Sequence, residues 1–223
     1  MTKKKSGLYV VLTGYPGCGK GTQAKILQNR LGIPHLSSGV MLRTEIKEAT
    51  PIGMKIKSII DAGDFAPDDI VEEMIQKRIE KADCRRGFIL DGFPRKLSQA
   101  ESLLSMMDKK GDKLSAVIDI QVSKEIIEER ILNRYVCSSC GQGYHDVFLN
   151  PKVYGVCDNC GYTEFHRRID DNRETIQSRL VNYNDFTYPI VSFFEEKGLL
   201  YHVDGTGSID GVAKKIEELL QNI

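Results

Sequence analysis

The sequence predicts an α/β fold: a parallel sheet with helices on both faces, interrupted by a small β-rich insertion. Short apolar runs alternate with longer stretches of helical periodicity along the 223 residues, a pattern typical of parallel sheets. A glycine-rich turn follows the first apolar run, and most of the cysteines gather in one late segment. We expect strands at residues 8–13, 35–37, 87–90, 116–122 and 200–203. We expect helices at residues 19–31, 67–82, 97–109, 123–135, 171–197 and 208–222.

Two segments depart from this alternation. Residues 37–66 form a helical excursion punctuated by Pro51 and Gly63. Residues 136–170 hold four of the cysteines, several glycines and short alternating runs, which favour a β-rich insertion between two long helices. The chain length therefore suits one domain that carries an insertion, or two small domains.

The composition is that of an ordinary soluble protein. Hydrophobic residues make up 41% of the chain, and 31 Lys+Arg balance 31 Asp+Glu. A formal net charge of zero gives no electrostatic reason to expect nucleic acid or an anionic membrane as a partner. The Lys3-Lys4-Lys5 run leads straight into the first strand without an apolar signal region, so we expect a solvated tail. No apolar run is long enough to span a bilayer, and we expect a cytoplasmic protein.

Residues 14–22, Gly-Tyr-Pro-Gly-Cys-Gly-Lys-Gly-Thr, predict a phosphate-binding loop (P-loop) between the first strand and the helix that follows. Glycines let backbone N–H groups approach phosphate closely, and the helix N-terminus adds partial positive charge. Lys20 can reach the β- and γ-phosphates, and Thr22 can face Mg²⁺. Gly21 departs from the usual pattern, because Ser or Thr normally follows the lysine there. Cys18 suits the loop as a small residue better than as a catalytic thiol.

Phosphoryl transfer also needs positive charge around the moving group, and arginine supplies it permanently. Arg130 and Arg134 are one helical turn apart in the predicted helix, so we expect them to share a face. Asp91 ends an apolar strand, where a carboxylate can hold Mg²⁺ or its waters; the alternative is a helix cap. Asp170 and Asp171 are likewise candidates to cap the next helix. The candidate arginines are Arg43, Arg95, Arg130, Arg134, Arg168 and Arg179.

Four cysteines form two Cys-x-x-Cys pairs, Cys137/Cys140 and Cys157/Cys160, separated by sixteen residues. This spacing is typical of a zinc ribbon, and four thiolates close the coordination shell, so the metal is structural rather than catalytic. Disulfides, redox chemistry and an iron site are the alternatives. His145 lies between the pairs, and either stacks on a base or serves as an ordinary side chain of the ribbon.

Taken together, these segments resemble adenylate kinases of the long-lid form, whose lid binds zinc. The similarity runs from the first strand to about residue 206. It is carried by the loop at 14–22, including the glycine after the lysine, by residues 36–43, by Gly-Phe-Ile-Leu-Asp-Gly-Phe-Pro-Arg at 87–95 with Gln99, by the pair Arg130 and Arg134, and by residues 168–179.

The resemblance implies a transferase, a nucleoside monophosphate kinase of nucleotide biosynthesis and AMP salvage. It implies the reversible, Mg²⁺-dependent reaction ATP + AMP = 2 ADP by direct in-line transfer, with lid closure excluding water. The expected partners are ATP, AMP and ADP, and the expected state is a monomer without a nucleic acid or membrane partner. It also implies a core at 1–132 and 171–223, an AMP-binding lid at 37–66 and a zinc-binding ATP lid at 133–170.

The resemblance further assigns site residues. For ATP it implies Gly17, Cys18, Gly19, Lys20, Gly21, Thr22, Arg130, Arg134, Gly143, Tyr144 and His202. For AMP it implies Ser38, Arg43, Asp64, Phe65, Ala66, Gly92, Phe93, Pro94, Arg95, Gln99, Arg168 and Arg179. As catalytic groups we expect Lys20, Asp91, Arg95, Arg134, Arg168 and Arg179, and as zinc ligands Cys137, Cys140, Cys157 and Cys160.

Some positions depart from the family pattern. Val40 stands where the family often has Asp, Lys96 where it usually has Thr, and residues 148–151 differ from the usual Phe-Asn-Pro-Pro. One alternative is a kinase for another nucleoside monophosphate; the long zinc-bearing lid and Gln99 argue against it by resemblance. A second is a zinc-ribbon nucleic-acid-binding protein with an ATPase core. Residues 137–160, which contain one lysine and no arginine, argue against that.

Overall fold

A five-stranded parallel sheet forms the centre of the computed structural model, which describes residues 7–223. The predicted basic tail at Lys3–Lys5 lies outside these residues. The strand order is β2-β3-β1-β4-β8, with every neighbouring pair parallel. This order confirms the predicted sheet. The strands are β1 (Leu8–Thr13), β2 (His35–Ser37), β3 (Gly87–Asp91), β4 (Ala116–Gln121) and β8 (Leu200–Asp204).

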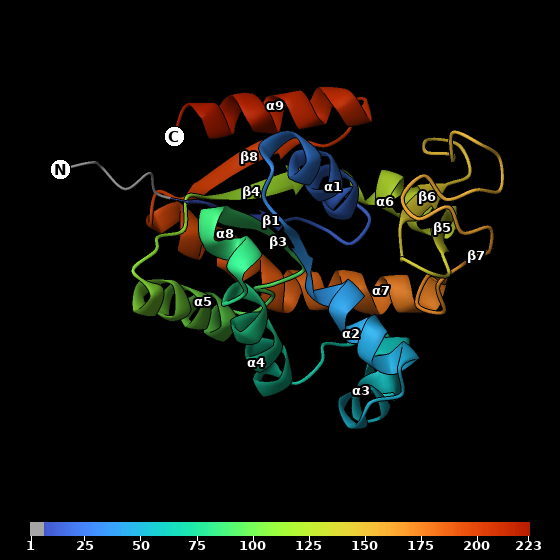
Figure 1. Ribbon diagram of the computed structural model, residues 1–223, viewed down its shortest axis with the longest axis horizontal. Coiled ribbons are helices and arrows are strands. Elements are labelled where there is room, and N and C mark those ends of the chain that lie inside the picture. The colour runs from blue at the N-terminus through green and yellow to red at the C-terminus, as the bar shows by residue number, and fades with distance from the viewer. Residues whose placement is uncertain (1–6) are drawn as a thin grey trace.

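Helices cover both faces of this sheet (Figure 1). Successive side chains of a strand point to opposite faces of the sheet, so the side chains of β1 pack into two separate hydrophobic cores. Val10 and Leu12 pack with α1 (Lys20–Leu31), α6 (Lys124–Leu132) and α9 (Ile209–Gln221). Tyr9 and Val11 pack with α4 (Asp68–Ile79), α5 (Leu97–Lys110) and α8 (Tyr188–Glu196).

The predicted helical excursion is a pair of helices, α2 (Ser38–Lys47) and α3 (Pro51–Asp61). The Ser37 hydroxyl caps α2, and the Thr50 hydroxyl accepts a hydrogen bond from Gly53 to cap α3, as short polar side chains do at helix starts. The pair stands at the end of the molecule toward which the strands point (Figure 1). It therefore borders the carboxyl edge of the sheet, where ligands of such folds bind.

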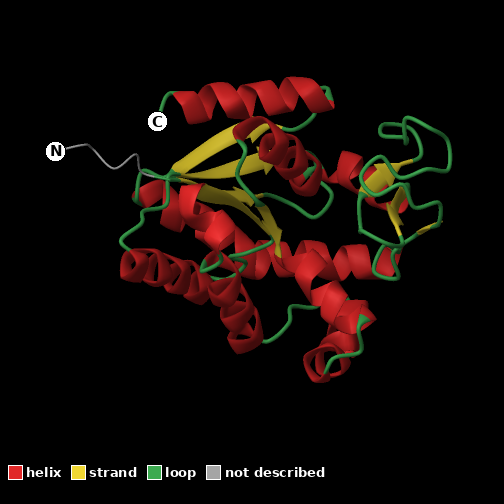
Figure 2. Cartoon of the chain, in the orientation of Figure 1, coloured by secondary structure: helices red, strands yellow, loops and turns green. Residues whose placement is uncertain are grey.

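The cysteine-rich insertion is a three-stranded antiparallel sheet of order β6-β5-β7, which confirms its predicted β character. Loops make up most of the insertion (Figure 2). Its strands are β5 (Arg134–Cys137), β6 (Gly143–His145) and β7 (Phe165–His166).

Two of the predicted helices are too long. The helix expected at 123–135 ends at Leu132, because Arg134 begins β5 and its backbone pairs with His145 of β6. The prediction that Arg130 and Arg134 share a helix face is therefore wrong. The prediction for 67–82 also overruns, since α4 ends at Ile79 and a 3₁₀ helix, η1 (Ala82–Arg86), follows.

The helix expected at 171–197 is interrupted in its middle. It consists of α7 (Arg173–Asn182), a π-helical turn η2 (Tyr183–Thr187) and α8. Pro189 lies in the first turn of α8, where it lacks the N–H that a continuous helix would require. Within residues 7–223, no helix has both the length and the apolar character required to cross a bilayer.

Candidate active site

The glycine-rich loop lies at the carboxyl end of β1 and leads into α1. Gly14, Gly17 and Gly19 have φ angles of 129°, 84° and 108°, which only glycine adopts without strain. A Cβ on Gly17 would also lie 2.7 Å from Ile131 Cγ1. The Lys20 ammonium folds back over the loop and donates to the carbonyls of Gly14 at 2.6 Å and Tyr15 at 2.8 Å. Two backbone carbonyls of the loop thus hold the Lys20 ammonium in place.

A carboxylate faces this loop from the neighbouring strand. Asp91 ends β3, and a Cβ on Gly21 would lie 3.4 Å from Asp91 Oδ2. The same oxygen is 3.4 Å from Nε2 of His35 on β2. Burial raises the pKa of Asp91, but the hydrogen bond with His35 and the Lys20 charge outweigh it, so the pKa lies below its ordinary value. An ionised carboxylate beside a phosphate loop suits a divalent cation. The sequence analysis missed His35 as the partner of Asp91.

A compact cavity lies beside α2 and α3 and collects most of the residues predicted for AMP. Two of the predicted residues fall outside it: Phe93 is buried in the core, and Pro94 lines the adjoining, larger cleft. The sequence analysis missed the apolar wall of the cavity, formed by Leu42, Ile60 and Val71. The predicted residues that do line it are Ser38, Arg43, Asp64, Phe65, Ala66, Gly92, Arg95, Gln99, Arg168 and Arg179.

Positive charges crowd this cavity. Burial and the nearby Arg168 lower the pKa of Arg43 to about 9, and burial and the same neighbour lower the pKa of Arg179 to about 9. Guanidinium groups retain their protons in proteins, so the shifts express mutual repulsion and loss of hydration rather than neutral arginines. A bound polyanion would relieve both costs. The arginine-lined cavity therefore suits an anionic group such as phosphate.

Two adjacent acids hold these arginines in place. Asp170 accepts from Nε of Arg168 at 2.8 Å and lies 3.3 Å from Nη1 of Arg179. Asp171 accepts from Nε of Arg134 at 2.8 Å and lies 3.2 Å from Arg179. The prediction that Asp170 and Asp171 cap the next helix is wrong. The capping box of α7 is instead formed by Asn172 and Thr175.

The larger cleft runs from the phosphate loop to the cysteine-rich insertion. It is lined by residues 16–23 together with Arg130, Arg134, Gly143 and Tyr144. Arg130 donates to the carbonyls of Cys18 at 3.3 Å and Gly205 at 3.0 Å. This arginine therefore ties the phosphate loop to the turn after β8.

His202 lies outside the lining of this cleft. Its Nδ1 is 3.0 Å from Asp119 Oδ2, and its side chain is 45% exposed. The turn after β8 lines the cleft instead, at Gly205–Ile209. The sequence analysis missed this turn, although its signal was present: two glycines directly follow a strand at the carboxyl edge of the sheet.

Two lysines of the core donate hydrogen bonds to the insertion. Lys47, the last residue of α2, donates to the Ser138 carbonyl at 2.9 Å. Lys25 of α1 donates to Oδ1 of Asn159 at 2.7 Å. Ser138 and Asn159 each lie inside a Cys-x-x-Cys turn. Both turns are thus tied to helices of the core that border the cleft.

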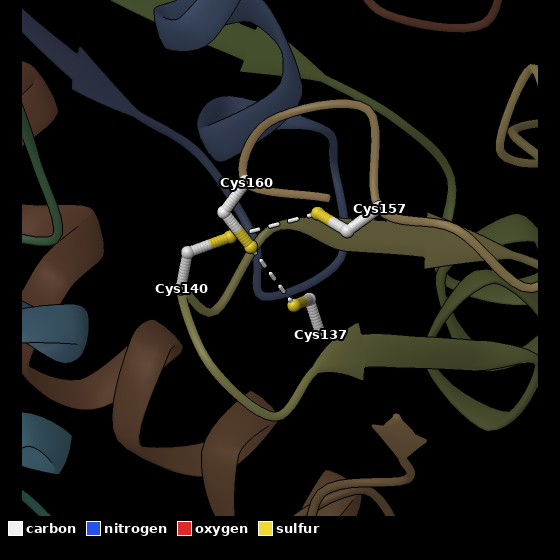
Figure 3. Close-up of side chains that lie close together, drawn as sticks. All are labelled: Cys137, Cys140, Cys157 and Cys160. Carbon is white, nitrogen blue, oxygen red and sulfur yellow. Dashed lines mark hydrogen bonds between the residues drawn. The ribbon is translucent and has the colours of Figure 1, made fainter. Parts of the chain in front are cut away.

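The four cysteines of the insertion converge on one point (Figure 3). All four sulfur atoms lie within 4.8 Å of one another. The Cys137–Cys160 and Cys140–Cys157 sulfur pairs are each 3.6 Å apart. A tetrahedral zinc site with Zn–S bonds of about 2.3 Å has sulfur–sulfur edges of about 3.8 Å. The side chains therefore fit a four-thiolate metal centre, and the cysteines are not bonded to one another.

Comparison with known proteins identifies the family. A family model described as adenylate kinase matches residues 12–199. A protein named adenylate kinase from Allorhizobium ampelinum is 48% identical over 214 residues, covering 96% of this chain and 99% of the relative. An adenylate kinase from Paramagnetospirillum magneticum is 48% identical over 211 residues, covering 95% of this chain and 97% of the relative. One from Archaeoglobus fulgidus is 42% identical over 214 residues, covering 96% of this chain and 98% of the relative. The chain belongs to the adenylate kinase family. Membership confirms the predicted family, and the sheet and four-cysteine insertion agree with the adenylate kinase fold that the sequence predicted.

Proposed function

We propose that the chain is an adenylate kinase, which transfers the γ-phosphoryl group of MgATP to AMP and forms two ADP. The observation that supports this most strongly is the junction of the two cavities. Both the compact cavity and the larger cleft are lined by the same four arginines, Arg43, Arg95, Arg168 and Arg179. Two phosphate chains that enter from opposite sides would meet at this junction.

The reaction needs no covalent intermediate on the protein. An oxygen of the AMP phosphate attacks the γ-phosphorus in line, the bond to the β,γ-bridging oxygen breaks, and ADP leaves. Catalysis then consists of positioning and neutralising the moving group. Lys20 and the loop N–H groups hold the phosphates of ATP, and Arg134 adds charge from the hinge of the insertion. Arg43 and Arg95 hold the phosphate of AMP.

Arg168 and Arg179 occupy the middle of this arrangement. Both line both cavities, and Asp170 fixes the two guanidinium groups in advance. Charge that is already in place stabilises a transition state without reorganisation. We assign these two arginines to the phosphoryl group in transit.

Thr22 and Asp91 would hold the Mg²⁺ that accompanies ATP. When bound, the cation neutralises β- and γ-phosphate charge. Asp91 remains ionised beside the loop, so it can accept hydrogen bonds from waters of the metal shell. Its contact with His35 holds the carboxylate at the loop.

We further propose three functional parts. Residues 1–132 and 171–223 form the core, 37–66 the AMP-binding lid and 133–170 the ATP lid. Contacts of Lys25 and Lys47 with the ATP lid hold it over the cleft, where it excludes water from the transfer step. One Zn²⁺ on the four cysteines stabilises this lid, and the enzyme works as a cytoplasmic monomer.

A coupled assay of ADP formation tests the proposal. Purified protein and MgATP are mixed with AMP, GMP, CMP or UMP, each in a separate reaction. We expect ADP only in the AMP reaction, and none when Mg²⁺ is removed by a chelator. A faster reaction with another monophosphate would assign the chain to a different specificity, and no transfer to any acceptor would refute the proposed reaction.

A further inference from the structure

Tyr144 contacts the four-cysteine cluster and also lines the larger cleft. It is the middle residue of β6, and its side chain is 3% exposed. It packs in the small core of the insertion beside Cys137 and Cys157. It also lines the cleft that extends from the phosphate loop. One residue therefore borders both the proposed metal centre and the proposed ATP site.

The hydroxyl group of Tyr144 contacts one of the cysteine ligands. Its Oη lies 3.5 Å from Sγ of Cys157 and 3.3 Å from Oδ2 of Asp158. The same oxygen accepts a hydrogen bond from the Asp158 backbone N–H at 2.8 Å. A phenol has one proton, so these two acceptors compete for it. Binding of a cation converts the Cys157 sulfur into a thiolate, which accepts hydrogen bonds better than a thiol does.

We propose that Tyr144 is a positioning residue of the metal centre, whose hydroxyl donates to the Cys157 thiolate when the cluster is loaded. The hydrogen bond fixes the second Cys-x-x-Cys turn on β6. Asn159 of that turn receives the hydrogen bond from Lys25 of α1, so the position of the turn also sets where the lid rests on the core. The inference relies on the structural metal proposed above and is independent of the transfer reaction.

Partners outside the first coordination shell commonly change metal affinity by about 10–100-fold when they are removed. Tyr144→Phe removes only the hydroxyl and keeps the buried ring. Tyr135→Phe is a matched control. Tyr135 belongs to the same sheet, and its ring lies 5.6 Å from that of Tyr144. Its hydroxyl, however, bonds to Asn150 at 3.3 Å rather than to a cysteine ligand.

The experiment compares both variants with the parent chain after replacement of the metal by Co²⁺. The sulfur-to-cobalt charge-transfer band should move to longer wavelength in Tyr144→Phe, because loss of a donated hydrogen bond raises the energy of the sulfur electrons. Release of Zn²⁺ to a chromogenic chelator should be about 10-fold faster or more in that variant. Tyr135→Phe should match the parent chain in both measurements.

A second variant should shift the cobalt charge-transfer band in the opposite direction. Asp158→Ala removes the carboxylate that competes for the Tyr144 proton, so its cobalt band should move to shorter wavelength. An unchanged band and a release rate within twofold of the parent in Tyr144→Phe would overturn the inference. Equal effects in Tyr135→Phe would also overturn it, because they would assign the change to ring packing. A parent chain that binds neither Zn²⁺ nor Co²⁺ would instead refute the structural metal itself.

Discussion

Replacing Lys20 with Met should abolish phosphoryl transfer while the fold survives. The ammonium lies inside the phosphate loop, where it donates to the Gly14 and Tyr15 carbonyls. Methionine keeps most of the length of the side chain and removes the charge. The substitution therefore isolates the electrostatic contribution of Lys20 from its packing.

The expected magnitude follows from Coulomb's law. Two unit charges about 4 Å apart interact by about 4 kcal/mol at the effective dielectric constant of about 20 that suits partly exposed sites. This energy corresponds to about a thousandfold loss of kcat/KM, because each factor of ten requires about 1.4 kcal/mol. The cost in stability is smaller. Gly14 lines the cleft, so water can replace the ammonium at its carbonyl, and we expect the free energy of unfolding to fall by about 1–3 kcal/mol.

The assay measures ADP formation from MgATP and AMP, together with thermal unfolding of each variant. A change of 1 kcal/mol shifts Tm by about 2–4 °C in a chain of this size, so Tm should fall by less than about 12 °C. Lys214→Met is the matched control, because Lys214 is a largely exposed residue of α9 whose ion pair, with Asp210, lies far from the phosphate loop in sequence. If Lys20→Met kept more than a tenth of the parent kcat/KM with an unchanged Tm, the phosphate-loop assignment would be wrong.

Other substitutions test the remaining parts of the site. Arg95→Ala and Arg134→Ala should each lower kcat/KM by about 10²-fold or more, because both charges act mainly in the transition state; steady-state kinetics in which neither variant lost tenfold would contradict the proposed clamp. Gly92→Ala should raise KM for AMP at least about tenfold. The new Cβ would lie 2.7 Å from Ser38 Oγ, at a backbone φ of 82° that alanine rarely adopts. An unchanged KM would refute this geometry. Cys157→Ser should lower zinc content and Tm together while activity in the cold falls far less than in Lys20→Met; complete loss of cold activity in folded protein would indicate a catalytic metal instead.

Local sequence patterns predicted the parts of the site that depend on neighbouring residues. The glycines of the phosphate loop and the two Cys-x-x-Cys pairs each define a short backbone conformation by themselves. The central strands were predictable for a similar reason, because β1, β3 and β4 are compact apolar runs. The structure moves the predicted strand ends by only one residue, as with β3, which extends to Asp91.

Features that depend on distant partners were not predictable in this way. Helical periodicity continues past residue 132, but pairing with residues 143–145 turns Arg134 into a strand residue. The contact between His35 and Asp91 joins residues 56 positions apart. The interruption at η2 has a local cause in Pro189, yet proline is also common in the first turn of a helix. A pattern within one segment cannot distinguish these outcomes.

The aspartates beside the arginines explain how the junction exists before substrate arrives. Burial, followed by repulsion from Arg168, lowers the pKa values of Arg43 and Arg179. Asp170 offsets this repulsion, and the Arg168 and Arg179 charges hold its own pKa well below the ordinary range, despite burial. Because folding lowers the pKa of Asp170, its ionised carboxylate stabilises the folded state at any pH above the pKa it has in the unfolded chain. This stabilisation is lost only in strong acid. At neutral pH the aspartates therefore keep the arginines oriented, and phosphate groups that enter the junction meet guanidinium groups already in position.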